Sequence, residues 1–211
     1  LGQVVVKTLA QSGPRVVGVD IAPSLGDIGQ AEFVGSVDLT DPAAVASAYA
    51  RIATTHGALH GLANIAGGFR WEEIGSGDAA TWDLLFNLNL RSTFNSCHAA
   101  LPALIEGGGS IVNIGAAAAL KAPAGMAPYA ASKAGVARLT EALAEEVKDK
   151  GVRVNAVLPS IIDTPANRAD MPNADYSRWV APADLANVIA FLLSDAAKAV
   201  TGACLPVTGR V

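Results

Sequence analysis

Short apolar runs alternate with longer segments of mixed polarity along the whole chain. The runs are continuous rather than alternating, which is typical of strands covered on both faces, and they lie at residues 15–20, 32–37, 59–65, 110–114, 152–158 and 203–207. The segments between them are predicted as helices, at residues 2–10, 41–52, 81–105, 126–149 and 182–194. These repeated strand–helix units predict an α/β fold with a doubly wound parallel sheet and helices on both faces.

The composition indicates one well-packed domain over residues 1–211 and argues against nucleic-acid and membrane partners. Apolar residues make up 51% and charged residues 16%, which excludes a disordered chain. The formal net charge of -4 lacks the basic surplus of a nucleic-acid binder, so no nucleic-acid partner is expected. No apolar run has the length of a membrane span and no secretory signal is visible, so we expect a cytoplasmic protein without membrane contact.

The cysteines and histidines form no metal or disulfide pattern. Cys97 and Cys204 are predicted to be buried thiols in a reducing cytoplasm. His56, His60 and His98 share no ligand-like spacing, so no metal site is expected.

Parallel sheets bind ligands at the carboxyl ends of their strands, so the residues just after each strand are candidates for chemistry. Asp20 ends the first strand, eighteen residues after Gly2, where a carboxylate can accept from an adenosine ribose and would repel a 2′-phosphate. This favours NAD(H) over NADP(H), although an aspartate that opens a surface loop is as common. Asp38 could accept from an adenine amino group or cap the next helix. The small residues at 64–68 would let the backbone approach a flat nucleotide, or form an ordinary tight turn.

The first residues have the character of the end of a glycine-rich turn. A dinucleotide-binding fold needs a strand and such a turn before its first helix. Because the sequence opens on Leu1 and Gly2, we expect that one strand and a loop precede it and that Gly2 lies at the cofactor.

Tyr129 and Lys133 are four residues apart on a predicted helix and therefore share one face. A lysine beside a phenol favours the phenolate, which would lower the tyrosine pKa towards neutrality and make the phenol a usable proton donor or acceptor. A Tyr–Lys pair on a solvated helix face is the alternative interpretation.

Four motifs occur in the order and spacing of the short-chain dehydrogenase/reductase family, which the chain resembles over essentially its whole length. They are Tyr129 and Lys133 of the Tyr-x-x-x-Lys signature, Asn64, Ala66 and Gly67 of the Asn-Asn-Ala-Gly motif, Asn89 of the helix asparagine, and Pro159 to Thr164 of the Pro-Gly-x-x-x-Thr motif. Each motif alone is weak, but their combination is specific. The resemblance implies a Rossmann-type oxidoreductase with a nicotinamide cofactor.

The resemblance also implies residue roles. Tyr129 would exchange the proton, Lys133 would hold the nicotinamide ribose, and Asn89 would fix a water that links Lys133 to solvent. The residues implied to bind the cofactor are Gly2, Asp20, Asp38, Leu39, Asn64, Ala66, Gly67, Tyr129, Lys133, Pro159, Ile162 and Thr164. The serine with which the family polarises its substrate aligns with Ala116, and losing one such donor generally costs on the order of 10²–10³ in rate.

A narrower resemblance concerns the segment 163–179, which is similar to the corresponding loop of dihydropteridine reductases. That branch also carries alanine at the serine position and prefers NADH. Its substrate, a quinonoid dihydropterin, is a conjugated electrophile that needs little polarisation. The ending at 208–211 departs from the Asp-Gly-Gly that is usual in the family.

Three functional hypotheses follow. The first is an NADH-dependent reductase of a small planar substrate such as a quinonoid dihydropteridine. The second is a general alcohol or ketone oxidoreductase in which another group replaces the serine. The third is an inactive NAD(H)-binding sensor or scaffold, against which the presence of Tyr129, Lys133 and Asn89 argues.

The substrate pocket is expected between Tyr129 and two variable segments, 69–71 and 160–180. Its candidate wall residues are Trp71, Ala116, Met171 and Trp179. Flat aromatic walls would suit a planar ring, although hydrophobic packing within a loop explains each tryptophan as well. In this family the helices at 81–105 and 126–149 pair with a symmetry mate, so we expect a homodimer or homotetramer. The small residues of the second helix would permit that contact, but alanines also favour helices for intrachain reasons.

Overall fold

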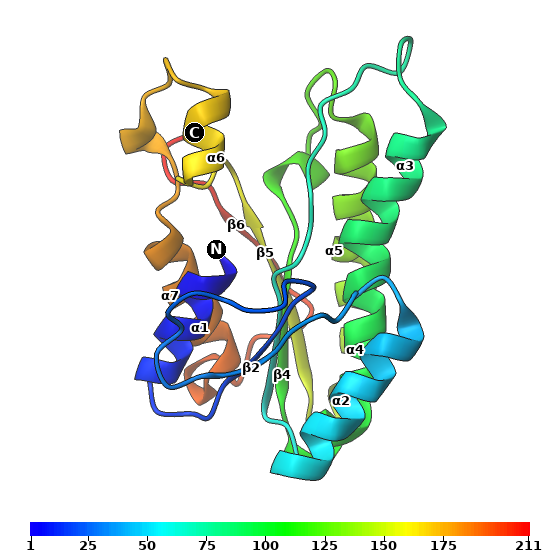
Figure 1. Ribbon diagram of the computed structural model, residues 1–211, viewed down its shortest axis with the longest axis vertical. Coiled ribbons are helices and arrows are strands. Elements are labelled where there is room, and N and C mark those ends of the chain that lie inside the picture. Colours follow the sequence, from blue (N-terminus) through cyan, green and yellow to red (C-terminus); the bar gives the residue numbers. More distant parts are fainter.

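Parallel strands form the middle layer of the computed structural model, which describes residues 1–211 (Figure 1). They are β1 (Val17–Val19), β2 (Glu32–Val34), β3 (Gly61–Asn64), β4 (Ser110–Ile114), β5 (Arg153–Pro159) and β6 (Cys204–Val207). The hydrogen bonds divide them into two sets, β1 with β2 and the series β3-β4-β5-β6. Each predicted strand is present, but β1 and β3 share no ladder, so the single predicted sheet occurs as two parallel sheets.

Helices cover both faces of this layer. One face carries α1 (Gly2–Gln11) and α7 (Pro182–Leu193), and the other carries α2 (Pro42–His56), α4 (Ser92–Gly107) and α5 (Ala127–Val147) (Figure 1). Smaller elements complete the chain: α3 (Ala79–Leu85), α6 (Pro165–Asp170), and short turns at Ala117–Ala119, Lys148–Lys150, Tyr176–Arg178 and Asp195–Ala197. This three-layer arrangement confirms the predicted doubly wound α/β class.

Burial on both faces explains the continuous apolar strands. All five residues of β4 are buried. Ile111 joins the core cluster beneath α2, α4 and α5, whereas Val112 joins the cluster that contains residues of α1 and α7. Successive side chains of a strand point to opposite faces, so a strand covered on both faces is apolar at most positions, and the buried polar residues of β4, Ser110 and Asn113, are hydrogen-bonded.

The helix ends follow local rules that the sequence carries. Asp41 accepts a hydrogen bond from the Ala43 N–H at 2.8 Å, and Pro42 opens α2, as predicted. At the end of α7, the Leu192 carbonyl accepts from the Arg153 guanidinium at 2.8 Å and from the Ser110 hydroxyl at 3.0 Å. These donors satisfy a carbonyl that has no partner within its helix, and they tie α7 to β4 and β5.

The helix predicted at 81–105 is interrupted. The structure has α3, then a π-helical turn at Phe86–Arg91, then α4. A π turn holds an extra residue and shifts the register of the side chains that follow, and such turns are frequent at functional sites. Asn89 lies in this turn and is completely buried. No helix of the structure is both long and apolar enough to cross a membrane.

Candidate functional site

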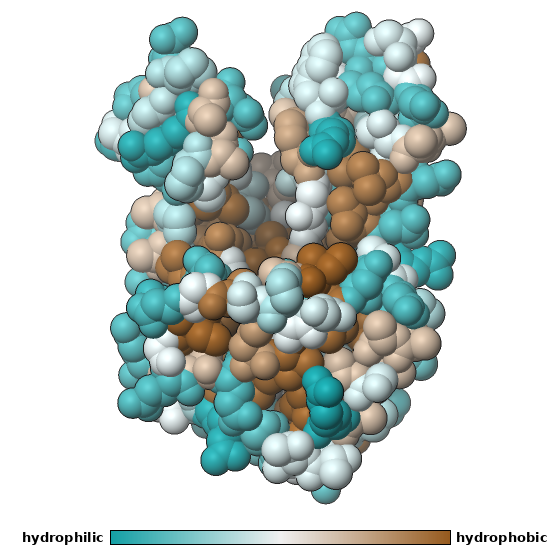
Figure 2. All heavy atoms as spheres, in the orientation of Figure 1, coloured by the Kyte–Doolittle hydropathy of each residue, from teal (hydrophilic) through white to brown (hydrophobic).

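The carboxyl ends of the parallel strands share one edge, and the molecule is hollowed there between the part that carries α6 and the part that carries α3 and the start of α5 (Figures 1 and 2). Apolar side chains are visible inside this hollow (Figure 2). Because parallel strands end at the same edge, residues that follow different strands can meet there. Asp20 follows β1, Ala66 and Gly67 follow β3, and Ala116 follows β4.

Lys133 joins three of the elements that form this edge. It lies one turn after Tyr129 on α5, as predicted, and its Nζ donates to the Ile114 carbonyl at the end of β4 at 2.8 Å. A Cβ added to Gly67 would lie 3.2 Å from the same Nζ and 2.6 Å from the Asn89 amide oxygen. The absence of a side chain at Gly67 therefore makes room for the lysine head group.

Asn89 connects the loop after β3 to α5. Its Nδ2 donates to the Gly68 carbonyl at 3.0 Å and to the Ser132 hydroxyl at 2.9 Å, and its Oδ1 accepts from the Gly68 N–H at 2.9 Å. The Ser132 hydroxyl in turn donates to the Tyr129 carbonyl at 2.7 Å. The expected water-holding role of Asn89 stays a prediction, whereas its side chain fixes the loop. The sequence indicated Gly68 only as one of the small residues at 64–68, and it indicated Ser132 only through its position between Tyr129 and Lys133.

The Tyr129 ring is largely buried and its hydroxyl is open. The ring packs edge-on against Phe69, with centroids 5.0 Å apart and planes at 89°. The Tyr129 hydroxyl has no hydrogen-bond partner in the protein. Every buried side-chain N or O atom does have such a partner, so the hydroxyl oxygen is not a buried atom and is accessible to solvent. An open hydroxyl on a held ring can exchange a proton with a molecule in the hollow.

The pKa shifts differ from the sequence prediction. Burial raises the pKa of Tyr129 above its ordinary value, and burial lowers the pKa of Lys133 to about 8. The predicted lowering of the tyrosine pKa by Lys133 is therefore wrong for this structure. The physical reason is that the lysine hydrogen bond goes to the Ile114 carbonyl, while desolvation disfavours the charged form of both groups. At neutral pH the phenol keeps its proton.

Ala116 lies in the turn between β4 and α5. It is buried and extended, with φ -159° and ψ 153°, and a 3₁₀ turn at Ala117–Ala119 follows it. The whole run 115–119 consists of glycine and alanine, so this turn offers no side-chain donor to a substrate.

The loop after β5 is organised around its own side chains. The Thr164 hydroxyl caps α6 by accepting from the Asn167 N–H at 3.2 Å, and the Asn167 Nδ2 donates to the Ile162 carbonyl at 2.7 Å. Trp179 is buried against the Tyr176 ring at 4.8 Å. Packing within the loop is enough to explain why Trp179 is buried, so a place for Trp179 in the pocket wall stays a prediction. The same holds for Met171, which is half-buried.

The residues predicted to bind the adenosine part of the cofactor form hydrogen bonds within the protein. Asp20 Oδ1 accepts from the Ala22 N–H at 2.9 Å, and Asp38 Oδ1 accepts from the Thr40 N–H at 2.8 Å and the Thr40 hydroxyl at 2.7 Å. The Thr40 hydrogen bonds lower the pKa of Asp38. The Leu39 carbonyl accepts from Asn95 at 3.0 Å. These bonds are what an aspartate in a surface loop makes with the backbone that follows it. Cofactor contacts by Asp20, Asp38 and Leu39 therefore stay predictions.

The residues at the strand ends fit a nicotinamide dinucleotide. Ala66 and Gly67 are exposed and have little or no side chain, so the backbone is open to a flat ligand beside Lys133. Gly2 begins α1, Asn64 ends β3 with its amide bonded to Asn113 at 2.8 Å, and Pro159 ends β5. No group of three or more His, Cys, Asp or Glu side chains lies where it could hold a metal ion.

Comparison with known proteins yields relatives that match nearly the whole chain at 30–34% identity. The sequence model of one family, described as enoyl-(acyl carrier protein) reductase, matches residues 1–209. A 2-(S)-hydroxypropyl-CoM dehydrogenase of Xanthobacter autotrophicus is 32% identical, with 99% of this chain and 91% of the relative covered. A cyclohexanol dehydrogenase of an Acinetobacter species is 34% identical, with 99% and 89% covered. The solved structure of a short-chain type dehydrogenase/reductase from Mycobacterium ulcerans is 30% identical, with a TM-score of 0.91 and 99% and 84% covered.

Proposed function

The chain belongs to the short-chain dehydrogenase/reductase family, whose members are oxidoreductases, and we infer that it transfers hydride between NAD(H) and a small, planar, conjugated substrate. The observation that carries this proposal is a Tyr129 hydroxyl without a protein partner, on a helix that packs against a turn with no second donor. A substrate that is already electron-poor needs no second donor.

The chain's own residues supply binding and proton transfer. When bound, the nicotinamide accepts or delivers the hydride. Asn64, Ala66, Gly67, Ile162 and Thr164 would hold the cofactor, together with Lys133 at its ribose. The Tyr129 hydroxyl would donate its proton to the reduced substrate atom, or take it back in the oxidation direction. A pKa raised by burial keeps that proton in place at neutral pH.

Asp20 supports NAD(H) over NADP(H). A carboxylate at the end of β1 would repel a 2′-phosphate, whereas it can accept from a ribose hydroxyl. The preference is tested by comparing kcat/KM for NADH and NADPH in the wild type and in Asp20→Ser, which should reduce the discrimination.

A quinonoid dihydropteridine is the substrate that Ala116 favours. Removing one oxyanion donor generally costs on the order of 10²–10³ in rate, which an unactivated ketone would suffer in full. A quinonoid ring accepts hydride with less polarisation. The exposed Phe69 ring packs against Tyr129, and the exposed Trp71 ring packs against Gly125 in the turn before α5, so both offer flat surfaces to such a substrate.

Oxidoreduction of a cyclic alcohol or ketone is the second candidate. It is favoured by the relative named cyclohexanol dehydrogenase, which is 34% identical to this chain. In this case a water or another group would have to replace the missing hydroxyl. Ala116→Ser separates the two candidates. Strong ketone turnover that Ala116→Ser leaves unchanged would support the second candidate, whereas weak ketone turnover that Ala116→Ser raises would support the first.

The deciding experiment follows NADH oxidation with freshly generated quinonoid dihydropterin and, separately, with cyclohexanone. Tyr129→Phe and NADPH serve as controls. Fast NADH-dependent turnover of the pterin that is lost in Tyr129→Phe supports the first candidate. Turnover of cyclohexanone alone supports the second, and NADH binding without turnover of either substrate contradicts the proposed activity.

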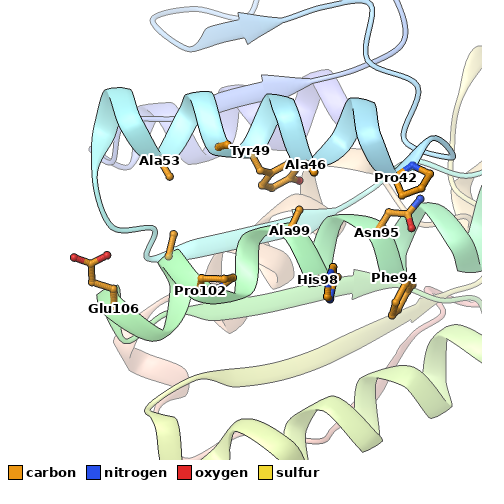
Figure 3. Close-up of a pocket in the computed structure, with 12 residues that line it drawn as sticks. Pro42, Ala46, Tyr49, Ala53, Phe94, Asn95, His98, Ala99, Pro102 and Glu106 are labelled. Carbon is orange, nitrogen blue, oxygen red and sulfur yellow. The ribbon is translucent and has the colours of Figure 1, made fainter.

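We also propose that the protein forms a homodimer or homotetramer through the helices predicted at 81–105 and 126–149. The outer face of α3, the π turn and α4 exposes Trp82, Leu84, Phe86 and Phe94. Beside them a groove of about 690 Å³ lies between α2 and α4, where Phe94 stacks on His98 at 5.7 Å (Figure 3). Exposed aromatic groups next to an apolar groove are typical of interfaces. Phe94→Glu should convert a dimer or tetramer to monomer in sedimentation, whereas a monomeric wild type would contradict this part.

A further inference from the structure

A closed circuit of contacts joins the segment after β3 to the first turn of α5. Gly68 is paired through both its N–H and its carbonyl with the side chain of Asn89. Asn89 donates to Ser132, and Ser132 donates to the Tyr129 carbonyl. The Phe69 ring, which follows Gly68, closes the circuit by packing edge-on against the Tyr129 ring. The backbone on each side of the ring pair is thus fixed to one completely buried side chain.

The segment is also fixed on the far side of Phe69. The Glu72 N–H donates to the Gly125 carbonyl at 2.8 Å. The Trp71 indole covers Gly125 so closely that a Cβ there would lie 2.2 Å from two indole atoms. The Glu72 carboxylate accepts from the Asp78 N–H and from the Thr81 hydroxyl, each at 2.7 Å. Phe69 therefore lies between two residues whose backbones are held by hydrogen bonds, Gly68 on one side and Glu72 on the other.

The Phe69 ring is partly accessible beside the phenol. It is 43% exposed, although its ring contacts Tyr129. Edge-to-face pairs have a preferred angle, so a fixed partner ring restricts how the phenol can tilt.

We propose that Phe69 is a positioning residue for Tyr129, and that its ring, held by the Asn89–Gly68 pairing, sets the direction in which the phenol hydroxyl faces the substrate. This inference rests on the proposed proton-transfer role of Tyr129. A displacement of about 1 Å in a reacting group can cost about 100-fold in rate, so loss of the ring should act on kcat.

The test compares Phe69→Ala, Phe69→Leu and Phe69→Tyr with the wild type. Phe191→Ala is the matched control, because Phe191 is 46% exposed but lies on α7, across the sheet from α5. We expect Phe69→Ala and Phe69→Leu to lower kcat by about 10- to 100-fold with an unchanged Kd for NADH. Phe69→Tyr, which keeps the ring, should stay near the wild-type kcat. The melting temperatures of all variants are measured to separate lost folding from lost positioning.

An activity-independent signal accompanies the kinetics. The ring resonance of Tyr129 is observed by NMR in protein with ¹³C-labelled tyrosine and assigned with Tyr129→Phe. Loss of the Phe69 ring current shifts this resonance by itself, so the line width is the signal of positioning: it should broaden in Phe69→Ala and keep its wild-type value in Phe191→Ala. A kcat within about threefold of wild type together with an unbroadened Tyr129 resonance would overturn the proposal. A wild type without turnover would contradict the proposed function alone, because the resonance still reports on positioning.

Discussion

The two walls of the hollow are held in different ways. The wall after β3 is tied to α5 through the buried Asn89 and Ser132 and to the β4–α5 turn through Gly125. In the wall at 160–180, Trp179 and Val180 are buried, but most side-chain hydrogen bonds are exposed and lie within the wall or run to the last residues of the chain. One wall is therefore coupled to Tyr129 by desolvated hydrogen bonds, and the other can change its side chains without moving the phenol.

The hydrogen bonds and ion pairs of the two walls differ in strength because they differ in solvent exposure. Arg168 bonds the Asp163 carboxylate through two nitrogens, one at 2.7 Å, and lies 4.5 Å over the Tyr176 ring. The Arg178 guanidinium donates to the Arg210 carbonyl at 2.7 Å. Solvent screens such exposed pairs, so each contributes little, whereas a broken bond to a buried amide leaves an unpaired polar group. We expect changes in the first wall to affect catalysis and changes in the second to affect substrate choice.

The largest contrast should come from two tyrosines, Tyr129, to which the first wall is coupled, and Tyr176 of the second wall. Tyr129→Phe removes the proposed proton donor and should lower kcat/KM by about 10³-fold without changing the Kd for NADH. Tyr176→Phe removes a hydroxyl that donates to the Pro172 carbonyl at 3.0 Å and should change kcat little. Steady-state kinetics of both variants on one substrate checks this. Equal losses would show that the two walls act alike.

Lys133 should give stability a pH dependence that exposed lysines lack. Its pKa is lowered from 10.5 to about 8, so between these values the unfolded chain binds more protons than the folded protein. The free energy of unfolding should therefore rise as pH increases through this window, and the cost of charging the buried lysine at lower pH is on the order of 3 kcal/mol.

Lys133→Met removes that titration. The difference in free energy of unfolding between Lys133→Met and the wild type should change by on the order of 3 kcal/mol between pH 7 and pH 11, as denaturant titrations would measure. Lys148→Met is the control, because Lys148 is exposed and bonded to Glu145, which raises its pKa. Parallel stability curves for Lys133→Met and wild type would contradict the prediction.

Two glycines with similar positive φ angles separate strain from contact. Gly125 has φ +74° and faces Trp71, whereas Gly29 has φ +68° and no atom within 4 Å of an added Cβ. Alanine should cost about 1 kcal/mol at either position through its positive φ. At Gly125 the displaced indole should add about 1–3 kcal/mol and shift tryptophan fluorescence. Equal costs in thermal unfolding would show that the Trp71 contact contributes nothing.

The smallest effect is expected in the second wall. Arg168→Gln removes an exposed ion pair and a ring contact, so the melting temperature should fall by less than about 3 °C. The KM of a bulky substrate should respond more than kcat does. A loss of kcat as large as that of Phe69→Ala would show that this wall also positions the phenol.

Much of the fold could be predicted from local spacing. The strand and helix order is present as predicted, and Asp41 and Pro42 open α2 because an N-cap depends only on neighbouring residues. The π turn at Phe86–Arg91 could not be predicted, because the apolar spacing of 81–105 fits an uninterrupted helix. The turn places Asn89 opposite Gly68, a partner twenty-one residues earlier in the chain.

Spacing and residue type are enough to show that Tyr129 and Lys133 share a helix face and that Ala116 brings no hydroxyl. The titration of these groups and the contacts that hold them depend on the folded structure. Burial raises the tyrosine pKa, the lysine donates to Ile114 on β4, and Phe69 meets Tyr129 across sixty residues. Desolvation and long-range pairing depend on which distant segments pack together, whereas local spacing fixes only the face on which a residue lies.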